Sequence, residues 1–249
     1  MKTFLIECYK ARRRRLGLIV LAMAAVAFLW MSVGLRKMDD ADRAMGYACC
    51  LYQAPLLNAI LLPVFIGVLV TRQCDMEHKG NALKALFTME KPESLFTAKF
   101  VLTGLYLLLA VALQAASFLL TGGIYGFTEA LPVADLLLYV LSQWLVSLFL
   151  ALVIQILSLR YVNQFIPLVA GLIGGFLGLM ALFFPPSIMR LVPSAYYGLL
   201  STVRMNWDPA ARFSEFYYVP FSVHDLLLLM AVGAAVFTAG ILRFRKREV

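Results

Sequence analysis

The chain has 249 residues, of which 62% are hydrophobic and only 14% are charged, and its mean hydropathy is +0.85. A soluble domain carries about 25% charged residues, so this chain has too little polar surface to cover itself in water. The composition excludes a secreted disulfide scaffold and a disordered chain, and it disfavours a soluble enzyme. An integral membrane protein is expected, and the net charge of +8 has to be explained by where the basic residues lie.

Residues 1–15 are predicted to form an amphipathic helix on the inner membrane surface. Apolar side chains recur there at helical spacing, while Lys2, Glu7 and Lys10 are predicted to face away from the membrane. The alternative is a frayed tail in which the cluster Arg12–Arg15 only sets the topology. The apolar run that follows is about twice as long as a signal-peptide core, and no small-residue cleavage site follows it, so a retained anchor is expected.

Six stretches of about 20 mostly apolar residues are long enough to cross a bilayer. None of them alternates polar and apolar residues over ten-residue segments, which disfavours a transmembrane barrel of strands. The predicted fold class is an all-α integral membrane protein with one transmembrane domain over residues 1–249. The predicted spans are Leu16–Leu35, Cys50–Val70, Phe100–Thr121, Leu136–Leu159, Phe165–Phe184 and Leu226–Leu242.

The distribution of Lys and Arg predicts that both termini are cytoplasmic. With this orientation 16 of the 22 basic residues lie on the inner side and 6 on the outer side, as the positive-inside rule requires. The basic residues then face anionic lipid headgroups. The positive net charge is explained by topology, and no nucleic-acid partner is expected.

The predicted spans contain no Asp, Glu, Lys, Arg or His. Ionisable groups inside a membrane usually carry function, so their absence argues against a transporter driven by protons. The strongest polar groups within the spans are amides, which are expected to form hydrogen bonds between helices rather than to bind substrate. They are Gln53, Asn58, Gln114, Gln143 and Gln155.

The sequence indicates no catalytic, metal or cofactor site. His78 and His224 are predicted to lie on opposite sides of the membrane, so they cannot share a metal ion. No G-x-x-x-x-G-K-[ST] motif occurs, so the chain has no P-loop for ATP. Cys49 and Cys50 are expected to pack as small apolar residues, the alternative being a strained disulfide between neighbours.

The fifth predicted span carries two overlapping G-x-x-x-G pairs. Such pairs allow a second helix to approach the backbone closely, and that helix can belong to this chain or to another. The glycines are Gly171, Gly174, Gly175 and Gly178.

The connection between the second and third spans, residues 71–99, is long and of mixed charge. Asp75–Met89 is predicted to form a short amphipathic helix, and Pro92 is predicted to end it and to begin the next turn. Glu77, Lys79 and Lys84 are predicted to be exposed on this helix. A charged helix joined rigidly to two spans suits a soluble partner, although an ordinary cytoplasmic connector has a similar composition.

This stretch resembles the cytoplasmic loop of type-2 ATP-binding-cassette (ABC) permeases, in which a coupling helix docks on the ATPase subunit. The layout of the chain is also similar: an elbow helix at residues 1–15, six spans, the long loop at residues 71–99 and an outer loop at residues 185–225 that resembles the family's re-entrant hairpin. Asn81 departs from the more usual Thr, and Lys91 stands where an apolar residue is common. The matching residues are Arg72, Glu77, Gly80, Asn81, Leu86, Thr88, Pro92, Ser94 and Lys99.

The resemblance implies a permease subunit of an ATP-driven exporter in the bacterial plasma membrane. Its implied partners are an ABC ATPase, expected as a dimer that holds the ATP and Mg²⁺, and a second, different permease. The amino-acid sequence of the loop is most similar to that of lantibiotic-immunity permeases, which implies a cationic antimicrobial peptide as substrate. The residues implied to couple to the ATPase are Glu77, Lys79, Gly80, Asn81 and Lys84.

Two alternatives remain open from the sequence. The same machine can export another amphiphile, such as a drug, a lipid or a glycan carrier. The chain can also be a membrane sensor or an assembly scaffold without transport activity, in which case no ATPase would co-purify with it.

Overall fold

The computed structural model describes residues 2–37, 43–78, 91–208 and 213–245. Within these residues it is mostly helical, and five helices are long and apolar enough to cross a membrane. A further apolar helix of 17 residues stands at the position of the fifth predicted span. The predicted fold class, a multi-span helical membrane protein, is confirmed.

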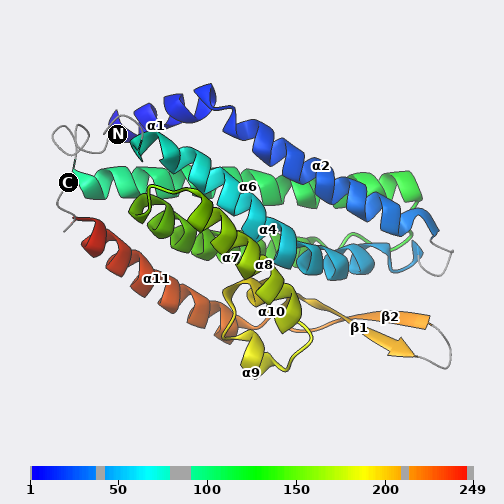
Figure 1. Ribbon diagram of the computed structural model, residues 1–249. Coiled ribbons are helices and arrows are strands. Elements are labelled where there is room, and N and C mark those ends of the chain that lie inside the picture. Colours follow the sequence, from blue (N-terminus) through cyan, green and yellow to red (C-terminus); the bar gives the residue numbers. More distant parts are fainter. Residues whose placement is uncertain (1, 38–42, 79–90, 209–212, 246–249) are drawn as a thin grey trace.

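Most helices extend beyond the predicted spans, because their end turns contain polar residues that a hydropathy pattern leaves out. Figure 1 shows the elements in chain order. The helices are α1 (Lys2–Arg13), α2 (Leu16–Gly34), α4 (Gly46–His78), α6 (Pro92–Tyr125), α7 (Val133–Arg160), α8 (Phe165–Ala181), α9 (Pro186–Met189), α10 (Tyr196–Leu199) and α11 (Val223–Arg245). The strands are β1 (Val203–Asp208) and β2 (Phe213–Tyr218).

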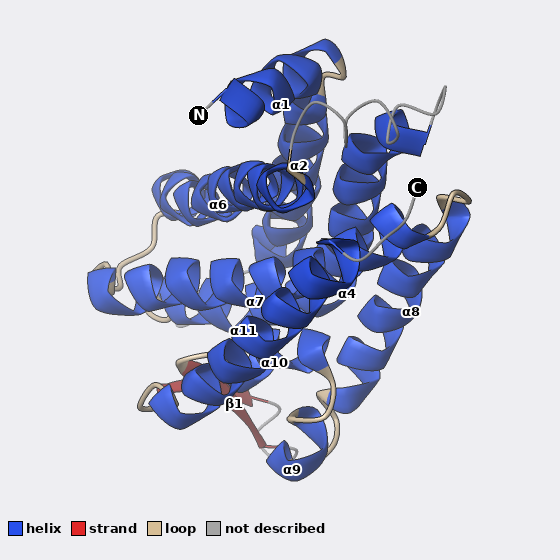
Figure 2. Ribbon diagram, turned by 90° about the vertical axis from the view of Figure 1, so that its left-hand side faces the viewer, coloured by secondary structure: helices blue, strands red, loops and turns tan. Residues whose placement is uncertain are grey.

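A left-handed residue separates α1 from α2. Arg15 has φ 53° and ψ 39°, and among the described residues it is the only one other than glycine with a positive φ. This conformation costs an L-residue about 1–2 kcal/mol. It ends α1 abruptly, so that α2 leaves in a new direction. Figure 2 shows α1 lying across the end of the bundle that faces the viewer.

Helix α4 is the centre of the bundle. It packs most extensively against α8 and α7, and it also contacts α2, α6 and α10 (Figures 1 and 2). Pro55 and Pro63 lie inside it. Each proline lacks the N–H that would bond the carbonyl four residues earlier, so Pro63 cannot donate to the carbonyl of Ala59.

Helix α8 approaches the backbone of α4 through its glycines. A Cβ atom on Gly171 would lie 2.6 Å from the carbonyl oxygen of Pro63. A Cβ atom on Gly175 would lie 2.8 Å from the carbonyl oxygen of Ile60. Both distances are shorter than real Cβ contacts, so the two helices can pack this closely only because these positions are glycine.

The other two glycines of α8 differ from each other. Gly178 faces the side chain of Ser194, and a Cβ on it would lie 3.2 Å from the carbonyl oxygen of Ala59. A Cβ on Gly174 would meet nothing within 4 Å, so Gly174 makes no close helix contact among the described residues, and its packing against a helix of another chain stays a prediction. Its helix face points away from α4, and its carbonyl accepts a hydrogen bond from the Ser194 hydroxyl.

The segment between α8 and α11 folds back onto the bundle and then forms a β-hairpin. The short helices α9 and α10 make the return, and Tyr197 of α10 is fully buried next to α4 and α7. Strands β1 and β2 then pair antiparallel, with Val203 opposite Tyr218. The sequence did not predict these strands, because two six-residue strands outside the spans leave no mark on a hydropathy pattern.

The two ends of the described chain lie at the same end of the bundle, with α1 and the last turn of α11 close to the N and C labels in Figure 1. The hairpin β1–β2 lies at the opposite end. This arrangement is the one that an even number of spans produces.

Candidate functional site

Three helices meet at the end of the bundle that holds both termini. Helix α1 packs against the first turns of α6, and its charged side chains reach the last turn of α4. Helices α4 and α6 flank residues 79–90, the middle of the predicted coupling loop, which lie outside the described residues. Four charged side chains join the three helices, and we call Glu7, Lys10, Glu77 and Lys99 the ionic quartet.

The ammonium group of Lys99 lies between the two carboxylates. Its Nζ is 2.7 Å from Glu7 Oε2 and 2.8 Å from Glu77 Oε1. Nζ of Lys10 is 2.7 Å from Glu7 Oε1 and 3.2 Å from Glu77 Oε1. Each lysine therefore contacts both glutamates, and the two positive charges balance the two negative charges.

The quartet is withdrawn from water. The exposed fraction is 0% for Lys99, 1% for Glu77 and 2% for Glu7, and Lys10 is partly exposed. Burying an ion costs several kcal/mol unless good ion pairs and hydrogen bonds compensate. Such a cluster is stable only when all its members are present in this geometry, so it fixes α1, α4 and α6 relative to one another.

Two predictions about exposure are wrong. Glu77 was predicted to be an exposed charge, but α4 continues past the predicted span end at Val70 and turns Glu77 toward Lys99. Glu7 was predicted to face away into water, but it faces the bundle because Lys99 and Lys10 pair with it. The role of Glu77 in coupling to an ATPase stays a prediction.

Hydrogen bonds around the quartet fix the register of α4 against α6. Lys99 Nζ donates to the backbone carbonyl of Gln73 at 3.2 Å, and Gln73 Nε2 donates to the backbone carbonyl of Lys99 at 3.3 Å. The Thr103 hydroxyl donates to Gln73 Oε1. Arg14 extends the connection to α4, with its Nη1 3.4 Å from Asp75 Oδ2.

The ion pairs also change the acidity of Glu77. Burial raises the pKa of its carboxyl group, but the ammonium groups of Lys99 and Lys10 outweigh this effect. The pKa of Glu77 therefore lies below its ordinary value. Glu77 is therefore a carboxylate at physiological pH.

The outer face of α1 is apolar. Leu5 and Tyr9 are 64% and 65% exposed, and Ile6 is also exposed. Phe4 and Cys8 pack against the bundle core instead. The helix therefore holds the bundle with charges on one side and presents large apolar side chains on the other, as a helix in the membrane interface does.

Most residues with a predicted coupling role lie outside the described residues: Lys79, Gly80, Asn81 and Lys84. The sequence reasoning missed Lys99 as a site residue. Lys99 is three or four positions from Leu95, Phe96, Leu102 and Thr103, all of which are buried. Helical periodicity could have placed this lysine on a buried face, which would have called for carboxylate partners.

A second polar network lies within the spans. Nδ2 of Asn58 on α4 lies within 3.1 Å of Gln114 Oε1 on α6, and 3.0 Å from both Tyr139 Oη and Gln143 Oε1 on α7. Gln143 in turn donates to the backbone carbonyl of Tyr197 at 3.1 Å. These side chains are buried within the chain, so Asn58, Gln114 and Gln143 bind one another between helices, as the sequence predicted. Gln53 differs, because its Nε2 donates to Cys49 Sγ of its own helix.

The described residues contain no group of three His, Cys, Asp or Glu side chains that could hold a metal ion. Nε2 of His78 donates a hydrogen bond to the backbone carbonyl of Ser158 at 2.8 Å. None of the four cysteines forms a disulfide, and Cys49, Cys50 and Cys74 are buried. Cys49 and Cys50 thus pack as small apolar side chains.

Ion pairs join the elbow helix α1 to α4 and α6, the helices on either side of the loop after the second span. These helices belong to a bundle of long apolar helices. A profile of the ABC-2 family transporter proteins matches residues 3–178, which extend from α1 almost to the end of α8. The chain belongs to the ABC-2 transporter family. No curated protein matches it.

As an ABC-2 transporter protein the chain is a multi-pass membrane permease, which has no ATPase activity of its own and works with an ATPase partner subunit. The matched region contains the whole ionic quartet and the glycines of α8. The hairpin β1–β2 and helix α11 lie outside it.

Proposed function

We propose that this permease is the membrane subunit of an ATP-driven exporter that removes a lantibiotic, or a similar cationic antimicrobial peptide, from the bacterial plasma membrane. A dimeric ATPase subunit binds the ATP and Mg²⁺, and a second, different permease completes the pathway. Both termini, and with them the ionic quartet, face the cytoplasm. The transporter thereby confers immunity or resistance on the cell.

The ionic quartet is the observation that supports the coupling part of the proposal. Glu77 is the second-last residue of α4, and Lys99 lies two turns into α6. The quartet therefore joins the two helices that precede and follow residues 79–90. A force applied to that segment by an ATPase reaches α4 and α6 together. The pairs of Glu7 and Lys10 pass it on to α1 at the membrane surface.

The substrate part rests on the resemblance of residues 77–100 to lantibiotic-immunity permeases and on the chemistry of the spans. Besides the amides that bind one another, the spans carry hydroxyls, aromatic rings and apolar side chains, and the predicted spans hold no charged side chain. Such a surface suits a bulky amphiphile better than a small ion. The peptide's own positive charges would stay near the lipid headgroups.

The test is expression of the permease with the ATPase and the second permease from its own locus in a lantibiotic-sensitive bacterium. We expect the minimal inhibitory concentration of the peptide to rise several-fold, and an ATPase that binds but does not hydrolyse ATP to abolish the rise. Protection against a drug but against no lantibiotic would contradict the proposed substrate and would identify the drug as the exported compound. Failure of any ATPase to co-purify would contradict the coupling proposal.

A further inference from the structure

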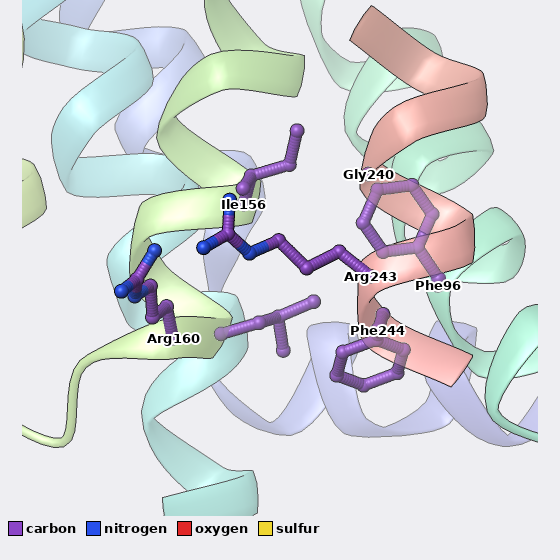
Figure 3. A pocket seen from close by; sticks show the side chains of 7 residues that line it. Phe96, Ile156, Arg160, Gly240, Arg243 and Phe244 are labelled. Carbon is purple, nitrogen blue, oxygen red and sulfur yellow. The ribbon is translucent and has the colours of Figure 1, made fainter. Parts of the chain in front are cut away.

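Two cavities lie in series along the seam between α7 and α11. The first, at the end that holds the termini, has a volume of about 300 Å³ and is lined by Phe96 of α6, Ile156 and Arg160 of α7, and Gly240 and Arg243 of α11 (Figure 3). The second has a volume of about 230 Å³ and lies farther along the same helices. Its lining is apolar and includes Phe149, Leu152, Gly233 and Phe237.

Two arginines share the first cavity. Figure 3 shows Arg243 reaching from α11 across the cavity toward α7, where Arg160 lies. Neither arginine has an ion pair with a carboxylate among the described residues, whereas Arg245 nearby pairs with Glu93 at 3.4 Å. Arg160 contacts the ring of Tyr161, 5.6 Å from its centroid. Two positive charges that face one space repel each other, so the site is suited to an anion.

The seam, from its arginines to the far end of its apolar cavity, is long enough to reach the middle of a bilayer. From Arg243 to Met230, which lines the second cavity, the helix rises about 20 Å at about 1.5 Å per residue. Half of the hydrocarbon core of a bilayer is about 15 Å. The seam therefore offers a charged place for a headgroup and an apolar place for a chain that extends toward the middle of the membrane.

We propose that the α7–α11 seam binds one anionic phospholipid. Its phosphate lies between Arg160 and Arg243, and an acyl chain occupies the apolar cavity along Gly233 and Phe237. Basic pockets between helices at the cytoplasmic side of a membrane are suited to such headgroups. The proposal needs only that the chain spans a membrane, so it is independent of the exported substrate.

The apolar cavity beside the arginines distinguishes a lipid from an acidic segment of a partner protein. A carboxylate from an ATPase could occupy the space between the arginines, but it would leave the apolar cavity empty. Met230, which lines the apolar cavity, is itself 46% exposed. The phospholipid satisfies both the charge and the apolar surface.

The test is native mass spectrometry of the purified full-length permease with phosphatidylglycerol or phosphatidylcholine. We expect the wild type to retain one phosphatidylglycerol in preference to phosphatidylcholine. The double variant Arg160→Gln/Arg243→Gln should bind phosphatidylglycerol roughly 30-fold more weakly, since each basic residue contributes about a factor of five. The control Arg12→Gln/Arg13→Gln removes the same charge from the exposed side of α1 and should leave the preference unchanged.

A second variant tests the apolar cavity. A Cβ atom on Gly233 would lie 3.4 Å from Phe149 Cδ2, an ordinary contact, so Gly233→Leu should fold and should fill the space proposed for the acyl chain. We expect it to lose lipid retention with both arginines intact. The proposal is overturned if Gly233→Leu retains the lipid and inorganic phosphate competes for the site. It is also overturned if the double arginine variant loses ATPase binding but keeps its lipid preference, or if the control variant loses that preference equally.

Discussion

Lys99 is the residue on which the end of the bundle depends. Its ammonium group is buried between two carboxylates, and its backbone and side chain both bond to Gln73. A buried ion pair is weak evidence for net stability, because desolvation offsets much of the attraction. Removal of one member is a different matter, since it leaves its partners charged and unpaired in a place that water does not reach.

Lys99→Met is expected to destabilise the permease by about 3–5 kcal/mol, because Glu7 and Glu77 would then repel each other with only Lys10 between them. The measurement is the thermal unfolding of the detergent-purified protein. Lys99→Arg should recover much of the loss. The control is Lys91→Met, at the exposed residue immediately before α6, which should change the midpoint of thermal unfolding little. Equal midpoints for Lys99→Met and Lys91→Met would show that the quartet does not hold the helices together.

The lowered pKa of Glu77 predicts a dependence of stability on pH. The folded carboxylate holds its proton less tightly than the unfolded one, so the unfolded state binds more protons and stability rises with pH. This contribution is complete above the ordinary value of 4.5 and is lost as the pH falls through the lower pKa of the folded state. The stability difference between wild type and Glu77→Gln should therefore shrink in acid. A difference that stays constant from neutral pH to pH 3 would contradict it.

At the scale of the helices, the contact between α4 and α8 depends on individual glycines. Gly175→Ala should destabilise the permease by about 1–3 kcal/mol, because its Cβ would lie 2.8 Å from the Ile60 carbonyl and would force the helices apart. Gly174→Ala is the matched control one residue away. It meets open space and should be neutral or stabilising by up to about 1 kcal/mol, since alanine favours a helix. Thermal unfolding distinguishes the two, and equal losses would contradict this packing.

The beginning of α4 depends on a residue from another element. Glu129, in the connection between α6 and α7, accepts hydrogen bonds from the backbone N–H groups of Tyr47 at 2.7 Å and Ala48 at 3.1 Å, and from the Tyr218 hydroxyl at 2.7 Å. Burial and the Glu129 carboxylate raise the pKa of Tyr218. Glu129→Ala should cost about 1–2 kcal/mol, as loss of a helix cap does. Tyr218→Phe, which keeps the cap, should cost less.

The sequence predicts the helices much better than it predicts their contacts. A run of 20 apolar residues is a local property, so the spans emerge from hydropathy with errors at their ends. Helix α4 continues beyond the predicted end, whereas α8 ends at Ala181, three residues before it. The pairing of Glu7 with Lys99 joins residues 92 positions apart, and no local pattern contains it. The role of Glu129 as a cap for α4 has the same origin, because the cap and the helix it caps are 82 positions apart.

The whole molecule has its termini at one end and its hairpin at the other. In a background with Cys8, Cys49, Cys50 and Cys74 replaced by alanine, a single cysteine at the exposed Glu215 of β2 should react with a membrane-impermeant thiol reagent in intact cells. Single cysteines at Arg12 and Arg245 should react only after the membrane is opened. Labelling at either of these two positions in intact cells would reverse the proposed orientation.

The ionic quartet also has a consequence for the synthesis of the chain. When Glu7 leaves the ribosome its only quartet partner is Lys10, and Lys99 follows 92 residues later, about 5–18 s at typical rates of translation. During this interval the elbow helix lies at the membrane without its anchor. A chain that stops before α6 leaves Glu77 without its buried lysine. Completion of α6 is thus the step that allows α1, α4 and α6 to pair. A product truncated before α6 is expected to expose unpaired charge, by which membrane quality control can recognise it.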